Sequence, residues 1–287
     1  MVASNLEIKK LGKTFGAEIR GIRLSDISSE EAKDLYDLWL QNSLLIFPDQ
    51  NISTDQQISF AKLFGNLEFD LSAISNVRDD GTIRDPIDDD VVKMLRGNME
   101  WHHDSTYMPI QAKGAVFSAH KVPKKGGETG WADMTAAYES LDQSMKHKIK
   151  DLNAYHSYLY SQAKYKHKSK EESEYNGYGF DTDPHPFRPL VKIHPETGKK
   201  SLLIGRHAYG IPGLSEAESK SLLEDLNDFA CQGERIYHHS WSEGDVVIWD
   251  NRCLMHQACP WDLNEPRIMY HSRIKGDSKS ESGLNYL

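Results

Sequence analysis

The chain has 287 residues, of which 38% are hydrophobic and 10% aromatic, a composition typical of a folded protein that buries a substantial core. Its apolar runs are too short to cross a bilayer, so we expect a soluble protein without a membrane partner. The formal net charge of −9 argues against nucleic acid as a partner, because no basic stripe is available to neutralise phosphates.

The N-terminal sequence MVASNLEIKKLGKTFGAEIRG lacks the apolar stretch of a signal peptide and the Arg and Ser bias of a transit peptide, which predicts a cytoplasmic protein. The three cysteines, Cys231, Cys253 and Cys259, have no zinc-type C-x-x-C spacing and fit reduced thiols in a reducing compartment. No internal repeat or Pro-, Gly- or Ser-rich linker divides the chain, so we expect a single domain over residues 1–287.

In the first part of the chain, strands are predicted in LEIKKL and GAEIRGI. The segment SSEEAKDLYDLWLQNS predicts a helix, because Ser and acidic residues precede apolar positions at helical spacing. SLLIFPDQ is typical of a buried strand that ends at Pro48, and Ser53 to Asp55 cap a second helix that Gly65 closes. The acidic, turn-rich segment 71–98 is predicted to be a mobile loop at the active site.

Further along, GAVFSAHKV predicts a strand, GGETGWADM a turn into a strand, and TAAYESLDQSMKHKI one helix. Segment 158–186, rich in Tyr and Lys, is a candidate active-site lid, with a solvated surface insert as the alternative. PLVKIHPETGKKSLLIGR predicts a hairpin, SEAESKSLLEDLNDFAC a helix, and RIYHHSWSEGDVVIWDNRCLMHQA and RIMYHSRI further strands. This pattern indicates a mainly β fold with helices (α+β), a sandwich or jelly roll.

The segment WHHDST, residues 101–106, suggests a metal site. His102 and Asp104 are two residues apart, so on an extended segment both side chains point to one face, whereas His103 points away. The best candidate for a third ligand is His256, since the apolar segment WSEGDVVIWDNRCLMH would carry it into the core. Two histidines and one carboxylate form the facial triad of non-haem Fe(II) oxygenases, although H-x-D alone is weak evidence.

Over nearly its whole length the chain resembles the Fe(II)/2-oxoglutarate-dependent dioxygenases of the taurine and 2,4-dichlorophenoxyacetate dioxygenase family. The matching segments are SLLIFPDQNISTDQQISFAKLFGNLE, ISNVRDDG, WHHDSTY, VPKKGGETGWADMTAAYESL, PLVKIHPETGKKSLLIGRHAYGIPGL and GDVVIWDNRCLMHQACPWD. Of these, ISNVRDDG and WDNRCLMH are more similar to the phenoxyacetate branch. The resemblance implies a double-stranded β-helix (cupin-like jelly roll) core flanked by helices.

The reaction that the resemblance implies uses Fe(II), 2-oxoglutarate and O2 to hydroxylate a small organic anion, with release of succinate and CO2. The anion would be an aryloxyalkanoate or another carboxylate, with taurine or an alkylsulfonate as the alternative. The resemblance makes His102, Asp104 and His256 the iron ligands. Relatives commonly form dimers or tetramers, so a homo-oligomer is expected.

For the cosubstrate, the resemblance assigns Arg267 and Thr129 to the distal carboxylate of 2-oxoglutarate. A planar guanidinium suits this role because it donates two parallel hydrogen bonds to a carboxylate. Asn98 matches a position beside cosubstrate and substrate, and His207 matches a histidine of the phenoxyacetate branch that would line the substrate pocket.

One position departs from the family, which has a second arginine where this chain has His271. Because 267, 269, 271 and 273 alternate onto one face of a strand, Arg273 could restore the charge beside the substrate. Alternatively, His271 could supply a shorter donor near the cosubstrate, cationic only at lower pH.

Two other classes of protein remain open from the sequence. A zinc-dependent hydrolase could use the same three ligands with Glu100 or Asp133 as base, but Arg267 would then have no purpose. A non-catalytic binding protein on the same scaffold need not retain the three ligands together with Arg267. Four histidines, His103, His120, His238 and His239, have no matching role in the family.

Overall fold

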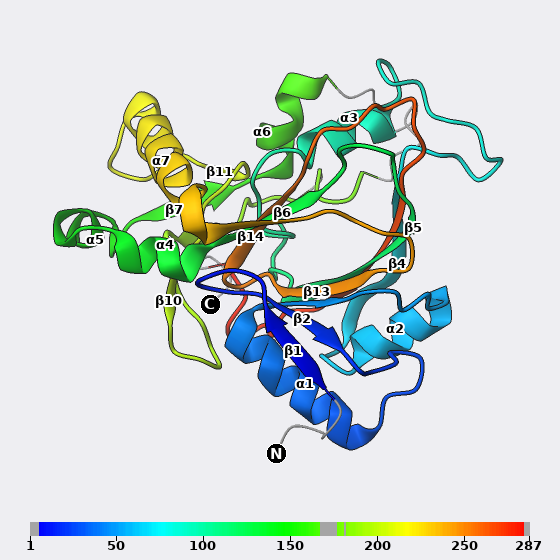
Figure 1. Ribbon diagram of the computed structural model, residues 1–287. Helices are drawn as coiled ribbons and strands as arrows, with labels where there is room; N and C mark the ends of the chain where they lie inside the picture. Colours follow the sequence, from blue (N-terminus) through cyan, green and yellow to red (C-terminus); the bar gives the residue numbers. More distant parts are fainter. Residues whose placement is uncertain (1–5, 167–176, 181, 284–287) are drawn as a thin grey trace.

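The computed structural model describes residues 6–166, 177–180 and 182–283 (Figure 1). Its longer helices are α1 (Ser29–Asn42), α2 (Thr54–Lys62), α3 (Asp90–Gly97), α4 (Met134–Ser140), α5 (Gln143–Ile149), α6 (Tyr158–Gln162) and α7 (Glu216–Ala230). Two short 3-10 helices are η1 (Ala163–Tyr165) and η2 (Gly233–Arg235). The strands are β1 (Glu7–Lys10), β2 (Ala17–Arg20), β3 (Leu44–Phe47), β4 (Leu67–Ser75), β5 (Gly114–Lys121), β6 (Thr129–Asp133), β7 (Asn153–His156), β8 (Phe187–Pro189), β9 (Val191–Ile193), β10 (Lys200–Leu202), β11 (Ala208–Tyr209), β12 (Ile236–His239), β13 (Val246–Asp250), β14 (Leu254–Ala258) and β15 (Ile268–Ile274).

Two sheets form the centre of the molecule. A seven-stranded sheet has the order β1-β2-β3-β13-β5-β15-β4, and a three-stranded sheet has the order β12-β6-β14. Side chains of both sheets meet in one apolar cluster, in which Phe117 and Trp249 of the larger sheet are joined by Trp131 and Leu254 of the smaller one. The two sheets therefore pack face to face as a jelly roll, which confirms the mainly β fold with flanking helices.

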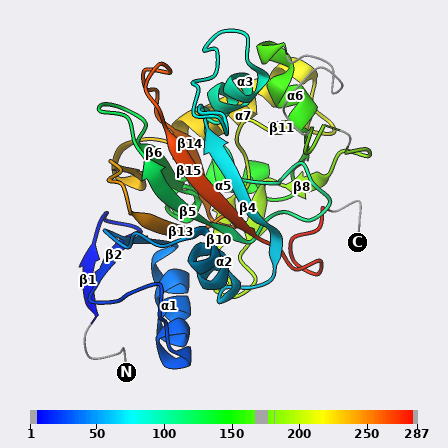
Figure 2. The same cartoon turned by 90° about the vertical axis from the view of Figure 1, so that its right-hand side faces the viewer.

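Alternation along the strands decides which face each side chain covers. In β3, Leu44 and Ile46 belong to the cluster between the sheets, whereas Leu45 and Phe47 pack toward helices α1 and α2 on the outer face (Figure 2). Helices α4 and α7 cover the outer face of the three-stranded sheet through another cluster (Figure 1). The layers are thus helix, sheet, sheet and helix.

The helix starts follow the expected capping chemistry. Ser28 and Ser53 each accept a hydrogen bond from the third backbone N–H of their helix, and the side chains of Glu31 and Gln56 accept one from the backbone N–H of the cap residue. Most of the predicted strands and helices are present, including the hairpin of β9 and β10.

Two predictions of local structure are wrong. Segment 71–98 is not a loop throughout, because β4 extends to Ser75 and α3 begins at Asp90. The Asp89 side chain caps α3, and Val92, Met94 and Leu95 on one face of this helix are buried. The acidic run therefore leads into an amphipathic helix. The single helix predicted in TAAYESLDQSMKHKI is two helices, since Leu141 is extended and the Asp142 side chain caps α5.

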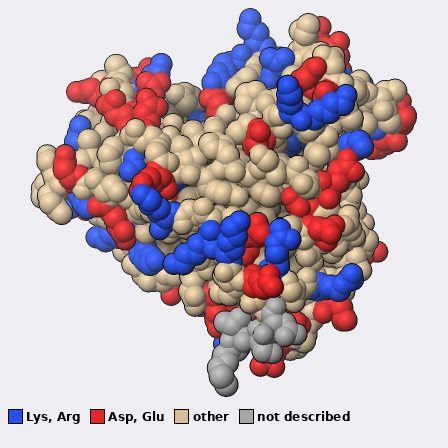
Figure 3. All heavy atoms as spheres, viewed as in Figure 1, with Lys and Arg blue, Asp and Glu red and all other residues tan. Residues whose placement is uncertain are grey.

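The predicted lid, residues 158–186, lies only partly within the described chain. It contains α6 and η1, and its residues 167–176 and 181 lie outside the described residues. Among the helices of the described ranges, none combines the length and apolar character that a bilayer span requires. Acidic and basic side chains are mixed over the face shown in Figure 3.

Candidate active site

His102 and His256 lie side by side because their backbones pair. His102 N–H donates to the carbonyl of His256 over 3.0 Å, and His256 N–H donates back over 2.8 Å. Asp104 follows two residues later, and one ligand atom from each of these three buried side chains lies within 4.8 Å of the others. The structure thus brings together the three ligands predicted from the sequence.

The protonation states of this cluster suit a metal. Burial lowers the pKa of His102 to about 4 and that of His256 well below its usual value, so both rings are neutral at pH 7. Burial would raise the pKa of Asp104, but the guanidinium of Arg273 and the neighbouring histidines outweigh it and hold that pKa well below normal. Neutral imidazoles and an ionised carboxylate are the forms that bind a divalent cation.

The ligand atoms are also oriented. Nδ1 of His102 lies 2.7 Å from the carbonyl of Glu100 and donates to it, which leaves the lone pair of Nε2 available to a metal ion. Arg273 binds Oδ1 of Asp104, while Oδ2 is buried and accepts no hydrogen bond from any described residue. A buried carboxylate oxygen without a donor is costly, so the donor set fits a divalent metal ion.

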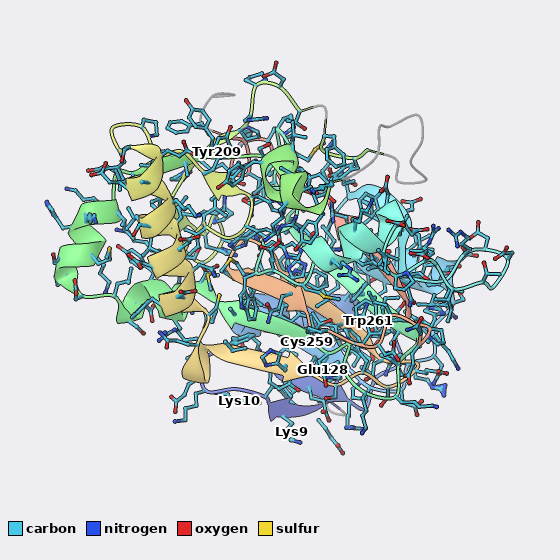
Figure 4. All side chains as sticks on the ribbon, turned by 90° about the horizontal axis from the view of Figure 1, so that it is seen from above. Lys9, Lys10, Glu128, Tyr209, Cys259 and Trp261 are labelled. Atoms are coloured by element: carbon cyan, nitrogen blue, oxygen red, sulfur yellow. The ribbon has the colours of Figure 1, made fainter. Side chains whose placement is uncertain are left out.

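Arg267 is a fully buried cation that has no counter-ion among the described residues. Burial lowers its pKa to about 10, its Nε donates to the carbonyl of Gly127 over 3.2 Å, and Nη2 has no partner among the described residues. Its guanidinium lies 5.1 Å from the ring of Trp261, which Figure 4 labels near Cys259 and Glu128. No carboxylate of the described chain pairs with it, so the position is suited to an external anion.

The turn at Gly127 allows this approach. Gly127 has a φ of +71°, and a Cβ there would lie 2.9 Å from Pro123 and 3.3 Å from Arg267. A larger residue would therefore be strained and would press against the guanidinium.

Thr129 and Asn98 line the same cavity as Arg267. Nε1 of Trp241 donates to Oγ1 of Thr129 over 3.0 Å, so the hydroxyl hydrogen of Thr129 remains available to donate to a ligand. Asn98 is the C-cap residue directly after α3, and its carbonyl accepts a hydrogen bond from the backbone N–H of Ala258.

His271 and Arg273 both reach the cavity from β15. The ring of His271 stacks on Trp249 with centroids 5.7 Å apart, and burial lowers its pKa to about 3, so it is neutral. Arg273 donates to Asp104 and, over 3.0 Å, to the hydroxyl of Ser105. Arg273 therefore carries the positive charge that His271 lacks.

The cavity has a volume of about 420 Å³ and a mainly apolar lining. His207 lines it, with Nδ1 2.8 Å from Oγ of Ser161, whose hydroxyl donates to the carbonyl of Tyr158. The sequence did not single out the other lining residues, most of which are apolar: Glu68, Phe69, Leu71, Ser72, Ile74, Met94, Tyr107, Phe117, Tyr158, Tyr178, Trp249 and Ala258. Two signals pointed toward some of them, the predicted active-site segment 71–98 and the excess of Tyr in segment 158–186.

Neither base proposed for a zinc hydrolase lines the cavity. Asp133 caps α4 through the N–H groups of Thr135 and Ala136, and Glu100 binds Lys164 and Tyr165. Of the other histidines, His103 points away from the cluster, with Nδ1 2.8 Å from the carbonyl of Asn251.

Comparison with known proteins gives consistent matches. The model of the taurine catabolism dioxygenase TauD, TfdA family matches residues 7–273. A protein of Sphingobium herbicidovorans named (S)-phenoxypropionate/alpha-ketoglutarate-dioxygenase is 58% identical over 280 residues, covering 97% of this chain and 98% of the relative. A protein of the same name from Delftia acidovorans is 52% identical over 285 residues, covering 97% and 98%. The crystal structure of AAD-2 in complex with Mn(II) and N-oxalylglycine is similar with a TM-score of 0.88 and 34% identity, covering 97% of this chain and 98% of that one.

Proposed function

The chain belongs to the taurine catabolism dioxygenase TauD, TfdA family, and from that premise we propose that His102, Asp104 and His256 hold the Fe(II) on which its reaction depends. The protein is a dioxygenase that uses 2-oxoglutarate and O2. One observation carries the site assignment: the buried cluster of two neutral histidines and a carboxylate shares a cavity with Arg267, a buried cation that no carboxylate of the described chain neutralises.

Arg267 and Thr129 bind the distal carboxylate of 2-oxoglutarate in this proposal. Nη2 of Arg267 binds no other group in the described ranges, and the hydroxyl hydrogen of Thr129 is available; both residues line one cavity as donors, which supports the proposal. A hydrolase would leave the Arg267 charge without a purpose. Fe(II), when bound, supplies the chemistry that side chains lack, the activation of O2 at the expense of 2-oxoglutarate.

The chain orients the ligands and keeps water out. The carbonyl of Glu100 sets the tautomer of His102, and Arg273 holds one oxygen of Asp104 so that the other faces the metal. His271, which is neutral, serves as a hydrogen-bond partner near the cosubstrate. The apolar side chains that line the cavity exclude water from the reacting groups.

The substrate that we propose is an aryloxyalkanoate, with (S)-2-phenoxypropionate as the first compound to test. The two relatives named for this substrate are more than half identical to the chain. Phe69, Leu71, Ile74 and Tyr107 offer an apolar surface to an aryl ring, which taurine lacks. Asn98, His207 and Arg273 are the candidates for contacts with the substrate's polar end.

We further propose that residues 1–287 form one catalytic domain and that segments 71–98 and 158–186 border its substrate side. Met94 and Asn98 from the first segment and Tyr158 and Tyr178 from the second line the cavity, which supports this. We also propose a cytoplasmic enzyme that forms a dimer or tetramer. Light scattering coupled to size-exclusion chromatography tests the oligomeric state.

The experiment that tests the function begins without oxygen. The purified protein is loaded with Fe(II) and 2-oxoglutarate, and the weak visible charge-transfer band of the chelate is recorded. Candidate substrates are then added: both enantiomers of 2-phenoxypropionate, phenoxyacetate and taurine. We expect the band to form, to shift with the aryloxyalkanoates, and succinate to accumulate on exposure to air. Zn(II)-supported hydrolysis in the absence of 2-oxoglutarate would instead establish a hydrolase.

A further inference from the structure

Two buried asparagines outside the proposed ligand set bind the backbones of two functional residues. Asn251 accepts the N–H of Asp104 at Oδ1 over 2.7 Å, and its Nδ2 donates over 2.9 Å to the carbonyls of Asp104 and Ala112. One side chain therefore satisfies both backbone groups of the proposed metal ligand.

Asn76 repeats this arrangement at the proposed cosubstrate site. Its Oδ1 accepts the N–H of Arg267 over 2.8 Å, and its Nδ2 donates over 2.9 Å to the carbonyls of Leu263 and Glu265. Its own backbone N–H donates to the carbonyl of Arg267 over 3.3 Å. One asparagine thus binds both the backbone N–H and the backbone carbonyl of Arg267.

The two asparagines share the same structural position. Each is the first residue after a strand, Asn76 after β4 and Asn251 after β13, and each has 0% exposure. In each, the side chain accepts one hydrogen bond and donates two, which fixes the orientation of the amide. Neither lines the cavity, so neither acts on a ligand directly.

Asp104 and Arg267 need such support because neither lies within a strand. Asp104 is in a turn, and the next residue, Ser105, has a positive φ of 55°, a conformation that is unfavourable for a residue other than glycine. Arg267 immediately precedes β15. Ladder hydrogen bonds hold the residues within a strand, and here the asparagine side chains supply the equivalent bonds.

We propose that Asn251 is a positioning residue for the metal ligand Asp104 and that Asn76 is a positioning residue for Arg267, the anchor of 2-oxoglutarate. This inference rests on the proposed function of those two residues. It predicts that Asn251 controls the affinity for the metal and Asn76 the affinity for 2-oxoglutarate, although the two are alike in residue type, burial and number of side-chain hydrogen bonds.

The test exchanges each asparagine for the nearly isosteric aspartate, in Asn251→Asp and Asn76→Asp. Aspartate keeps the acceptor for the backbone N–H but places an oxygen opposite two carbonyls. Mn(II) affinity is measured on the metal-free protein by electron paramagnetic resonance of free Mn(II). The affinity for 2-oxoglutarate is measured by calorimetry at saturating Mn(II). Each variant is the matched control for the other.

We expect Asn251→Asp to weaken Mn(II) binding about 10- to 100-fold, as loss of an outer-shell partner commonly does, with little change in 2-oxoglutarate affinity once metal is saturating. Asn76→Asp should weaken 2-oxoglutarate binding and leave Mn(II) affinity near that of the wild type. If an aspartate variant does not fold, the Asn251→Ser and Asn76→Ser pair replaces it, with circular dichroism and thermal unfolding as checks.

Equal losses of both affinities in both variants would overturn the inference, as would wild-type affinities in both. Asp104→Ala and Arg267→Ala separate these results from a failure of the proposed function. If Asp104→Ala loses Mn(II) and Arg267→Ala loses 2-oxoglutarate while the asparagine variants keep both, only the inference fails. If Asp104→Ala and Arg267→Ala bind both ligands normally, the site assignment itself is wrong.

Discussion

Arg273 donates a hydrogen bond from Nη2 to Oδ1 of Asp104 over 2.9 Å, and both side chains are buried. This pair joins a candidate substrate residue to a proposed metal ligand. It keeps Asp104 ionised and leaves Oδ2 available to the proposed metal ion. A positive charge is thus present two residues after His271, next to the proposed metal site.

Replacing Arg273 by Met should destabilise the metal-free protein by about 3 kcal/mol, because the Asp104 carboxylate is then buried without a partner. Mn(II) should restore part of this loss, since the cation compensates the same charge. Urea unfolding of wild type and variant, with and without Mn(II), measures both quantities. A variant as stable as the wild type in the absence of metal would show that the pair does not carry this energy.

Replacing Arg267 by Ala should raise the KM for 2-oxoglutarate by about 100-fold or more, because two charge-assisted hydrogen bonds to a carboxylate are lost. Arg267→Lys should recover only part of this, since an ammonium group cannot bind a carboxylate with two parallel bonds. Steady-state kinetics at saturating Fe(II) gives the KM. Unchanged KM values in both variants would place the distal carboxylate elsewhere.

Much of the fold was predictable because buried strands appear in the sequence as short, continuous apolar runs, whose side chains cover both faces of a sheet. In β13, Val246 and Ile248 face the helices while Val247 and Trp249 face the smaller sheet, as a period of two requires. Helix α3 was missed because its acidic flank resembles a loop and its apolar stripe is short. The break at Leu141 was missed because the helical pattern continues on both sides of it.

Only part of the site was predictable from the sequence. The spacing of His102 and Asp104 is local, so a sequence pattern can indicate it, and the family resemblance supplied the distant partners. The packing around them is not local. That Arg273 pairs with Asp104, or that Asn76 and Asn251 hold the backbones of Arg267 and Asp104, depends on contacts between segments far apart in the chain.

His256 and His238 offer a matched pair for testing the ligand assignment, since they lie on β14 and β12, the two strands that flank β6. His256→Ala should abolish tight Mn(II) binding and coupled succinate formation, because only two ligands remain. His238→Ala should leave both unchanged, since His238 does not line the cavity. Calorimetric Mn(II) titrations check this, and normal metal affinity in His256→Ala would rule out His256 as a ligand.

The buried pair of Asp250 and Arg252 gives a prediction about pH and stability. Oδ2 of Asp250 accepts from Nη2 of Arg252 over 2.7 Å and from Nε2 of His194 over 3.0 Å. Burial would raise the pKa of Asp250, but Arg252 and His194 outweigh it, so the folded-state pKa lies well below the unfolded value of about 3.9. The ionised carboxylate therefore stabilises the fold above about pH 4 and loses that contribution as the pH falls further.

Asp250→Asn should accordingly lower the free energy of unfolding by about 3 kcal/mol at pH 7, because Arg252 loses two charge-assisted hydrogen bonds to its buried carboxylate partner and keeps only Glu196 as a counter-ion among the described residues. The difference from the wild type should stay constant down to about pH 5 and shrink below about pH 4, where the unfolded wild-type carboxylate takes up a proton. Urea unfolding at several pH values measures it, with Asp151→Asn, at an exposed aspartate, as the control that should show no difference. A difference that grows as the pH falls would mean that the folded-state pKa of Asp250 is raised, contrary to the geometry of the pair.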